Sequence, residues 1–97
     1  MYTATMRYVF KEKDFEEACR LWEDIVLAPA KGAKGLVRMQ LLAAKPQALA
    51  IGTWTDKKYA EEFMRTGIFK TLKERIVSMQ AAEPASELWE LRDFYQA

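Results

Sequence analysis

The stretch that decides the fold is ALAIGTWTDKKYAEEFMRTGIF, residues 48–69. It begins as an uninterrupted apolar run at 48–51, and a short run of this kind indicates a strand that is covered on both faces. The stretch then passes through Trp54 to Thr55 and Asp56, whose side-chain oxygens can accept the free amide hydrogens of a helix that starts next. Apolar residues then recur with helical spacing. The sequence therefore predicts a central strand that leads directly into a helix, with a tryptophan at the junction.

The residues before this stretch predict a strand, a helix and a second strand. Residues 2–10 alternate between an apolar set and a mixed set, which is typical of a strand with one apolar face. Asp14 and Glu17 have the spacing of a capping box, and the apolar stripe that follows predicts a helix that ends at Pro29. Residues 36–44 read as a strand, and the tight connection around Pro46 predicts a hairpin with the central strand.

The residues after this stretch predict one more strand. The helix that starts after Asp56 should bend or break at Gly67, and its apolar spacing continues to near Ala81. Pro84 marks the next boundary, and residues 86–95 supply a last strand with large side chains. The order β-α-β-β-α-β over a single domain, 1–97, predicts an α+β, ferredoxin-like fold. In this fold a four-stranded antiparallel sheet carries both helices on one face.

The other face of the predicted sheet is rich in apolar side chains. An apolar sheet face of this size is rare on the surface of a monomer. We therefore expect a second copy to cover it, giving a sheet-to-sheet homodimer. The apolar residues that point away from the helices are Val9, Leu36 and Leu42, with either Leu88 and Phe94 or Trp89 and Tyr95 from the last strand.

Composition excludes several kinds of site. The chain has neither histidine nor asparagine, which removes His-ligated metals and haem, Ser–His pairs and His–carboxylate pairs. The net charge of +1 argues against a nucleic-acid partner. No apolar run approaches the roughly 20 residues of a membrane span, and no leader is recognisable. Cys19 is the single cysteine, which favours a reducing, cytoplasmic location.

Two short motifs resemble a known superfamily. They are the junction at residues 52–56, Gly-Thr-Trp-Thr-Asp, and the broken helix that carries Tyr59, Phe63, Ile68 and Phe69. With the order of elements, they make the chain similar to dimeric α/β barrel proteins, and most of all to small antibiotic-biosynthesis-monooxygenase-like proteins. The resemblance implies a ligand cavity between sheet and helices, and an activity without cofactors. Of the residues that such oxygenases use, only the tryptophan maps here, onto Trp54, while the histidine of many relatives falls near Phe63.

Trp54 and Arg38 are the candidate catalytic residues. Trp54 can cover a planar substrate and donate its indole hydrogen, although a core tryptophan would look the same in sequence. Arg38, and with it Arg7 as a candidate substrate-binding residue, interrupts an otherwise apolar strand, and a buried guanidinium is costly unless it is paired. These arginines either bind a carboxylate or enolate of the substrate, or pair with acidic residues of the last strand or of a second copy.

Four aromatic residues complete the predicted substrate contacts. Trp22 lies on the inward stripe of the first helix, and Phe63 lies on that of the second. Tyr8 and Tyr59 offer hydroxyl groups as hydrogen-bond donors or weak acids. Each of the four equally suits a packed core, because aromatic residues on an inward face are usually buried there.

Two functions follow from these patterns. The first is a cofactor-free monooxygenase, or an isomerase or cyclase, that acts on a small aromatic or polyketide-like compound. It needs a dry cavity, a donor that stabilises an anion, and a modest base. The alternative is a non-catalytic homodimer that holds a small apolar or aromatic ligand or docks a partner. This binding module predicts a pocket of Met, Phe and Trp side chains with at most one charge.

Overall fold

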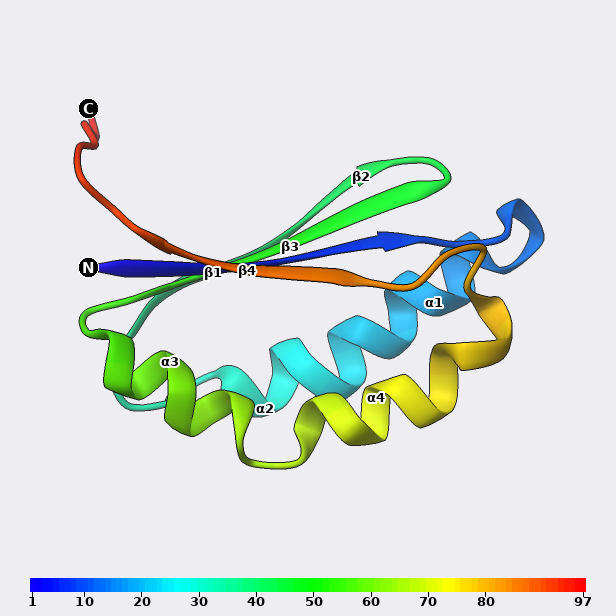
Figure 1. Ribbon diagram of the computed structural model, residues 1–97, viewed down its shortest axis with the longest axis horizontal. Coiled ribbons are helices and arrows are strands. Elements are labelled where there is room, and N and C mark those ends of the chain that lie inside the picture. Colours follow the sequence, from blue (N-terminus) through cyan, green and yellow to red (C-terminus); the bar gives the residue numbers. More distant parts are fainter.

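The strands form one four-stranded antiparallel sheet in the order β2-β3-β1-β4. The computed structural model describes all residues 1–97. Its strands are β1 (Tyr2–Val9), β2 (Leu36–Ala44), β3 (Gln47–Trp54) and β4 (Ala85–Glu90). β2 and β3 make the predicted hairpin (Figure 1), and β3 and β1 occupy the centre of the sheet.

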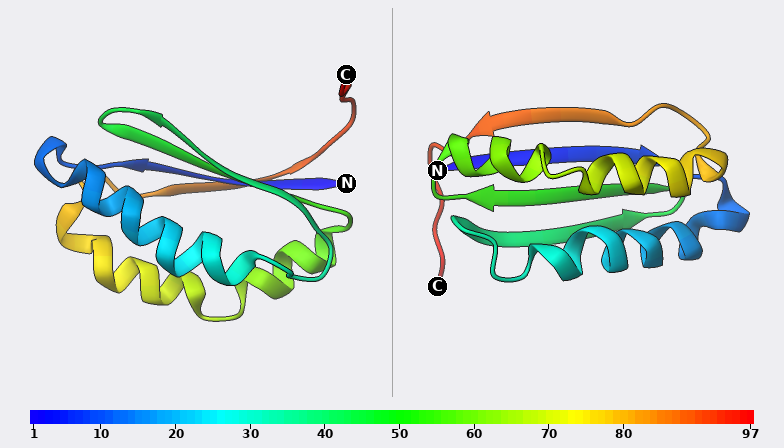
Figure 2. Two further views of the ribbon diagram at one scale, coloured as in Figure 1. Left: turned by 180° about the vertical axis from the view of Figure 1, so that it is seen from behind. Right: turned by 90° about the horizontal axis from the view of Figure 1, so that it is seen from below.

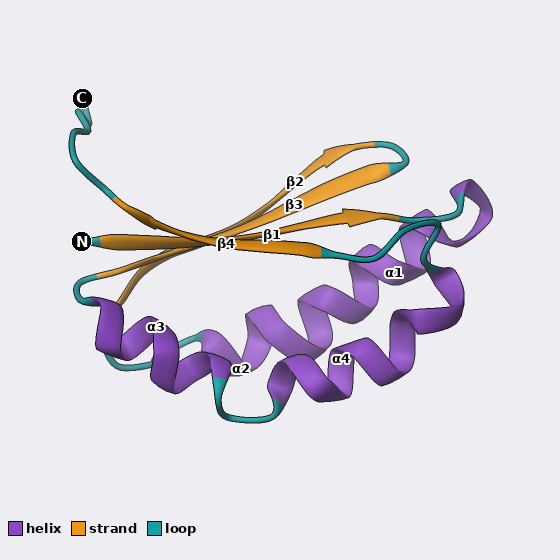
Figure 3. Ribbon diagram, in the orientation of Figure 1, coloured by secondary structure: helices purple, strands orange, loops and turns teal.

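All helices lie on one face of the sheet (Figure 3). The first helical segment runs from the short 3-10 turn η1 (Glu12–Asp14) through α1 (Phe15–Trp22), the π-helical turn η2 (Glu23–Leu27) and α2 (Ala28–Ala30). The second helical segment consists of α3 (Lys57–Met64), α4 (Ile68–Ile76) and the 3-10 turn η3 (Val77–Met79). Gly67, with φ of 89°, separates α3 from α4. The predicted α+β, β-α-β-β-α-β arrangement and the break at Gly67 are confirmed.

The two predicted helix caps differ in the structure. Asp56 has extended backbone geometry, and its side chain accepts a hydrogen bond from the amide of Lys58 at 3.0 Å. Asp14 makes no side-chain cap bond, because the 3-10 turn that precedes α1 gives it nearly helical backbone angles. Glu17 bonds Arg20 instead of reaching back. The predicted capping box is therefore wrong, and the predicted cap at Asp56 is confirmed.

The first helix passes Pro29, where the sequence predicted its end. Pro29 lies in the last short segment, α2, directly after the π-helical turn η2. A proline ring inside an α-helix clashes with the carbonyl four residues earlier, here that of Ile25. Ile25 lies within the π-helical turn, whose wider spacing moves that carbonyl away from the proline ring. The chain turns out of the helix at Gly32, which has φ of 83°.

The strand registers decide which side chains face the helices. Ala4, Met6 and Tyr8 of β1 face them, as the alternation predicts, and Tyr8 is buried. In β2 the register shifts between Leu36 and Arg38. This bulge turns Leu36 onto the core. The expectation that Leu36 points away from the helices is therefore wrong, and neighbouring Val37 is exposed instead.

β4 is shorter than the predicted strand of residues 86–95. Glu90 lies opposite Tyr2, and the amide of Leu91 makes one more bond to the carbonyl of Met1. No later residue of the chain pairs with β1. The remaining residues leave the sheet on the side away from the helices, and Phe94 and Tyr95 are exposed (Figure 1).

The face of the sheet opposite the helices is left open (Figure 2). Arg38, Thr53, Thr3 and Trp89 lie side by side across the four strands of this face. Trp89 is half exposed, and its indole nitrogen donates to the Thr5 hydroxyl at 3.0 Å. The sheet-to-sheet homodimer stays a prediction, because the structure describes one chain. No helix is long and apolar enough to cross a membrane.

Candidate functional site

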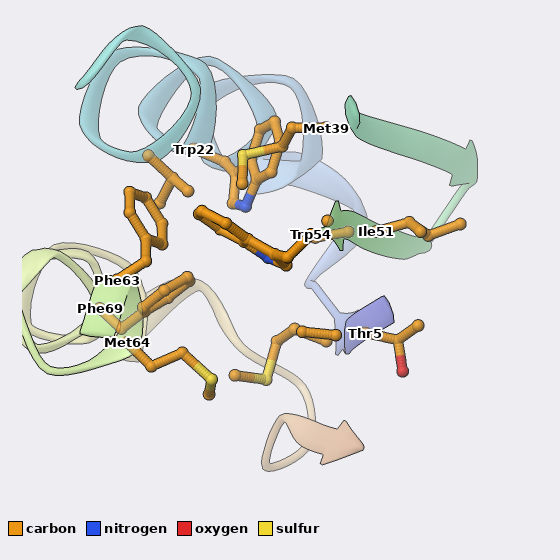
Figure 4. Close-up of a pocket in the computed structure, with 13 residues that line it drawn as sticks. Thr5, Trp22, Met39, Ile51, Trp54, Phe63, Met64 and Phe69 are labelled. Atoms are coloured by element: carbon orange, nitrogen blue, oxygen red, sulfur yellow. The ribbon is translucent and has the colours of Figure 1, made fainter. Parts of the chain in front are cut away.

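An apolar cavity lies between the sheet and the helices, beside the junction of β3 and α3 (Figure 4). Its volume is about 40 Å³, which is room for a few waters. The sheet contributes Met6, Met39 and Trp54, and the helices contribute Trp22 and Phe63, among other lining residues. An aromatic ligand requires a pocket of roughly 300 Å³ or more, so side chains have to move for one to enter.

Trp54 is the centre of an aromatic wall. It is 2% exposed, and its ring lies 5.2 Å from that of Phe63, which in turn meets Phe69 edge-on at 5.8 Å. Gly52 makes room for the indole, because a Cβ at this position would lie 3.2 Å from Trp54 Nε1 and 3.2 Å from the Met39 methyl group. A side chain at position 52 would therefore require Trp54 or Met39 to shift by a few tenths of an ångström.

Trp22 brings an unused hydrogen-bond donor to the cavity. Its side chain is buried, and no group of the chain accepts a bond from Nε1. A buried donor without a partner costs about 1–3 kcal/mol. Figure 4 shows the nitrogen directed toward Trp54. The π-helical turn begins one residue later and places Val26 in the same lining. A ligand oxygen next to Trp22 would satisfy this donor.

Three methionines make up the adaptable part of the lining: Met6, Met39 and Met64. Met64 is 42% exposed and ends α3, directly before the break at Gly67. Methionine has three rotatable bonds and fills irregular gaps, so it changes conformation at little cost. These side chains are the part of the lining most able to open the cavity.

No titratable side chain lines the cavity. Thr5 lines it, but its hydroxyl accepts the bond from Trp89 on the open face. The polar groups that remain are the indole N–H groups of Trp22 and Trp54. The cavity can therefore exclude water, stack against a planar ring and donate hydrogen bonds to an oxygen. It holds no side chain able to take up a proton.

The predicted arginines are not brought together with Trp54. Arg7 and Arg38 are exposed residues of β1 and β2, and neither lines the cavity. Arg7 donates to Gln47 at 3.2 Å, and Arg38 donates to Gln96 of the C-terminal segment at 3.4 Å. Their positions on the strands direct both side chains to the open face. No ion pair with an acidic residue of the last strand forms within the chain.

The two predicted tyrosines also lie outside the cavity. Tyr8 is buried two residues after the lining residue Met6 on β1. Burial raises the pKa of its hydroxyl. Tyr59 packs against Gly35 and lies under the ammonium groups of Lys34 and Lys58, at 5.6 and 5.1 Å from the ring centre. The structure thus gathers Trp22, Trp54 and Phe63 of the candidate residues.

Met39, Met64 and Phe69 line the cavity but were not among the candidate site residues. The binding-module hypothesis predicted side chains of these two types in the lining without naming positions. Phe69 was part of the aromatic motif after the helix break, so its spacing from Phe63 could have indicated the wall. Met39 lies on β2, and only the register places it opposite Gly52 and next to Trp54. No local pattern reveals that contact.

Comparison with solved structures finds the same fold elsewhere. An antibiotic biosynthesis monooxygenase has a TM-score of 0.80 at 14% identity, over 96% of this chain and 100% of that chain. A candidate antibiotic biosynthesis monooxygenase from Deinococcus radiodurans has a TM-score of 0.85 at 8% identity, over 100% and 98% of the two chains. A protein of unknown function from Bacteroides thetaiotaomicron, described as a possible oxidoreductase, has a TM-score of 0.77 at 15% identity, over 93% and 96%.

No family model and no curated protein matches the sequence. The chain has the fold of the antibiotic biosynthesis monooxygenase structures, as its order of elements and motifs predicted. At these identities the likeness establishes the fold and leaves the reaction to be argued from the site.

Proposed function

We propose that this chain is a cofactor-independent monooxygenase-like protein that acts on a small aromatic or polyketide-like compound in the cavity beside Trp54. The observation that carries the proposal is the aromatic wall of Trp54, Phe63 and Phe69, which encloses an apolar space with two indole N–H groups. Such a space favours a flat, apolar ligand that carries oxygen acceptors.

The reaction places few demands on the protein. A carbon of a phenolate or enolate that carries a hydrogen gives up two electrons to O₂, and a C–O bond forms. The peroxide anion takes up a proton to become a hydroperoxide. Loss of water, with the hydrogen of that carbon, then leaves a carbonyl. The protein has to exclude water and hold the anion by hydrogen bonds. The apolar lining of the cavity can exclude water. The buried, unpartnered indole N–H of Trp22 can donate to the anion, and the indole of Trp54 is a second donor in the same lining.

The cavity has no base, so the substrate has to arrive as an anion or lose its proton to water. Burying an anion in an apolar space is costly, which restricts the substrate to delocalised anions. Hydroxylated aromatics form such anions in alkaline solution, since a phenol ordinarily has a pKa of about 10. We therefore expect the pH dependence of the rate to follow the pKa of the substrate, and to move with it across a substrate series.

The same absence of a base favours the second candidate, a non-catalytic binding module. A cavity lined by Met, Phe and Trp side chains without charge suits a neutral aromatic ligand equally well. The two candidates differ in turnover. A ligand that co-purifies unchanged, is seen by mass spectrometry and is not consumed under O₂ supports the binding module.

Oxygen uptake with a panel of dihydroxyaromatic compounds tests the first candidate. We expect uptake by the wild type and a loss of tenfold or more in Trp54→Phe, since one lost donor to the anion costs about 1.5–3 kcal/mol. Tyr95→Phe is the matched control, because Tyr95 is 89% exposed and does not line the cavity. Uptake that is equal in the wild type and Trp54→Phe would exclude Trp54 from the reaction.

The open face of the sheet supports a homodimer as the working form. Leu49 and Leu42 lie side by side on it, and Ile51 and Trp89 extend the apolar surface toward β4. Exposed apolar side chains on a sheet favour burial against a like sheet. Arg7 belongs to the same face, where an acidic residue of a two-fold related copy could pair with it.

A further inference from the structure

A second hollow, which we call the outer groove, lies between α4 and the segment that leads into β4. It has a volume of about 300 Å³, the lower end of the range for ligand pockets. Its floor consists of Tyr8 from β1 and Phe69, Leu72 and Ile76 from α4, and its far end is closed by Pro84. Figure 2 shows β4 at the edge of the sheet, beyond the line of α4.

The rim of the outer groove is positively charged. Lys70 and Lys73 line it from adjacent turns of α4, where residues three apart are neighbours on the helix surface. Their stems contribute apolar area, which leaves the ammonium groups at the edge. Neither lysine belongs to an ion pair of the chain, and the acidic residues Glu74 and Glu83 do not line the groove.

The end of the groove near β1 has a polar side chain without a partner. Gln80 lines the groove, and its backbone is fixed by a bridge to Phe10. Its Nε2 is shielded from solvent and bonds to no group of the chain. The groove therefore combines an apolar floor, two unpaired cations and an unused amide.

We propose that the outer groove is a binding site for an apolar compound that carries one carboxylate, an aliphatic or aryl carboxylic acid. The apolar body would lie on Leu72 and Ile76, and the carboxylate would lie between Lys70 and Lys73. Charge complementarity selects an anion over a neutral or cationic compound of the same shape.

The outer groove adjoins the cavity beside Trp54. Met6 and Phe69 line both hollows, so the two are separated by little more than these side chains. The inference goes beyond the proposed reaction, because the groove binds its ligand whether or not the cavity is catalytic.

Calorimetric titration of the full chain with decanoate, decanol and decyltrimethylammonium tests the groove. We expect decanoate to bind more tightly than decanol and the cationic probe not to bind. Replacing both lysines, Lys70→Gln with Lys73→Gln, should lower the affinity for decanoate about fivefold, as expected for two exposed charge contacts. The affinity for decanol should be unchanged. Lys57→Gln with Lys58→Gln is the matched control, since these α3 lysines line neither hollow and the decanoate affinity should stay.

Three outcomes would overturn the proposed carboxylate site. The first is equal affinity for decanoate and decanol, and the second is an unchanged decanoate affinity in the Lys70, Lys73 double variant. The third is an equal loss of decanoate affinity in both double variants, because such a loss would reflect net charge alone. Gln80→Glu gives an independent check. The negative charge that this substitution adds to the groove should lower the affinity for decanoate and leave the affinity for decanol unchanged. None of these titrations involves turnover, so their failure is separable from a failure of oxygen uptake.

Discussion

Gly35 is the residue at which backbone conformation and packing meet. Its φ is 80°, and a Cβ there would lie 2.5 Å from Tyr59 Cγ, whereas Gly32 has φ of 83° and open space around it. Alanine would be strained at both positions, because a left-handed backbone is unfavourable for a residue with a Cβ. At Gly35 the Cβ would in addition clash with the first atoms of the Tyr59 side chain.

The two glycines give a matched pair of variants. We expect Gly32→Ala to lower the free energy of unfolding by about 1 kcal/mol, and Gly35→Ala to lower it by about 2 kcal/mol more through overpacking. Urea denaturation at constant m-value measures both. If the clash is the cause, Tyr59→Ala should remove much of the difference between the two variants, and an unchanged difference would contradict it.

Tyr8 is a buried acid whose pKa is raised by loss of solvation. Its hydroxyl stays neutral in the folded chain at a pH where the unfolded chain ionises, near 10. Stability is therefore unaffected below that pH and falls as pH rises above it, by up to about 1.4 kcal/mol per pH unit.

Tyr8→Phe removes this ionisation and keeps the ring in the core. We expect the variant to lose less stability than the wild type between pH 9.5 and about 11, a window set by the ordinary tyrosine pKa near 10. Other tyrosines and the lysines titrate equally in both proteins, so the difference between the two denaturation series isolates Tyr8. Parallel series would show that Tyr8 ionises freely in the folded state.

At the scale of the element, the two helix starts differ in how they are capped. Asp56 accepts the bond from the Lys58 amide, whereas Asp14 makes no cap bond, because a 3-10 turn leads into α1. A lost cap costs about 1 kcal/mol, and a carboxylate near a helix start without a bond contributes less.

We therefore expect Asp56→Ala to lower stability by about 1 kcal/mol and Asp14→Ala by less than half of that. Asp56→Ser should retain most of the wild-type stability, because the serine oxygen can accept the same bond. Thermal and urea denaturation measure all three. Equal losses in the two alanine variants would mean that the cap geometry at Asp56 contributes nothing.

At the scale of the whole molecule, the open face of the sheet leads us to predict a homodimer. Leu49 lies near the middle of the open face, between Leu42 and Arg7. A lysine there would meet its own symmetry mate or a buried apolar surface across a sheet-to-sheet interface.

We expect sedimentation equilibrium to give about twice the chain mass of 11.2 kDa for the wild type, and the single-chain mass for Leu49→Lys. Val77→Lys is the control, because Val77 is 56% exposed on the helical side and its replacement should leave the dimer intact. Circular dichroism confirms that each variant is folded. A wild type that stays monomeric at high concentration would overturn the dimer.

Much of this fold could be predicted because its signals are local. The alternation in residues 2–10, the helix break at Gly67 and the cap at Asp56 each depend on residues a few positions apart. The inward side of both helices was predictable for the same reason, which is why Trp22 and Phe63 were recognised as inward-facing.

The site itself was decided by contacts between distant parts of the chain. The register of β2 on β3 brings Met39 to Trp54, and the bulge at Leu36 reverses one predicted orientation. Arg38 could be recognised as unusual in sequence, but only the sheet shows that it belongs to the open face. The length of β4 depends on its pairing with β1.

The sequence by itself determined the order of elements, the helix break, the apolar faces and the absence of any histidine chemistry. The tertiary structure decided which aromatic and methionine side chains share the cavity and that no base accompanies them. The physical reason is that periodicity assigns each residue to a face, whereas neighbours across the fold depend on strand register and helix packing. Those long-range relations leave no mark in a short stretch of sequence.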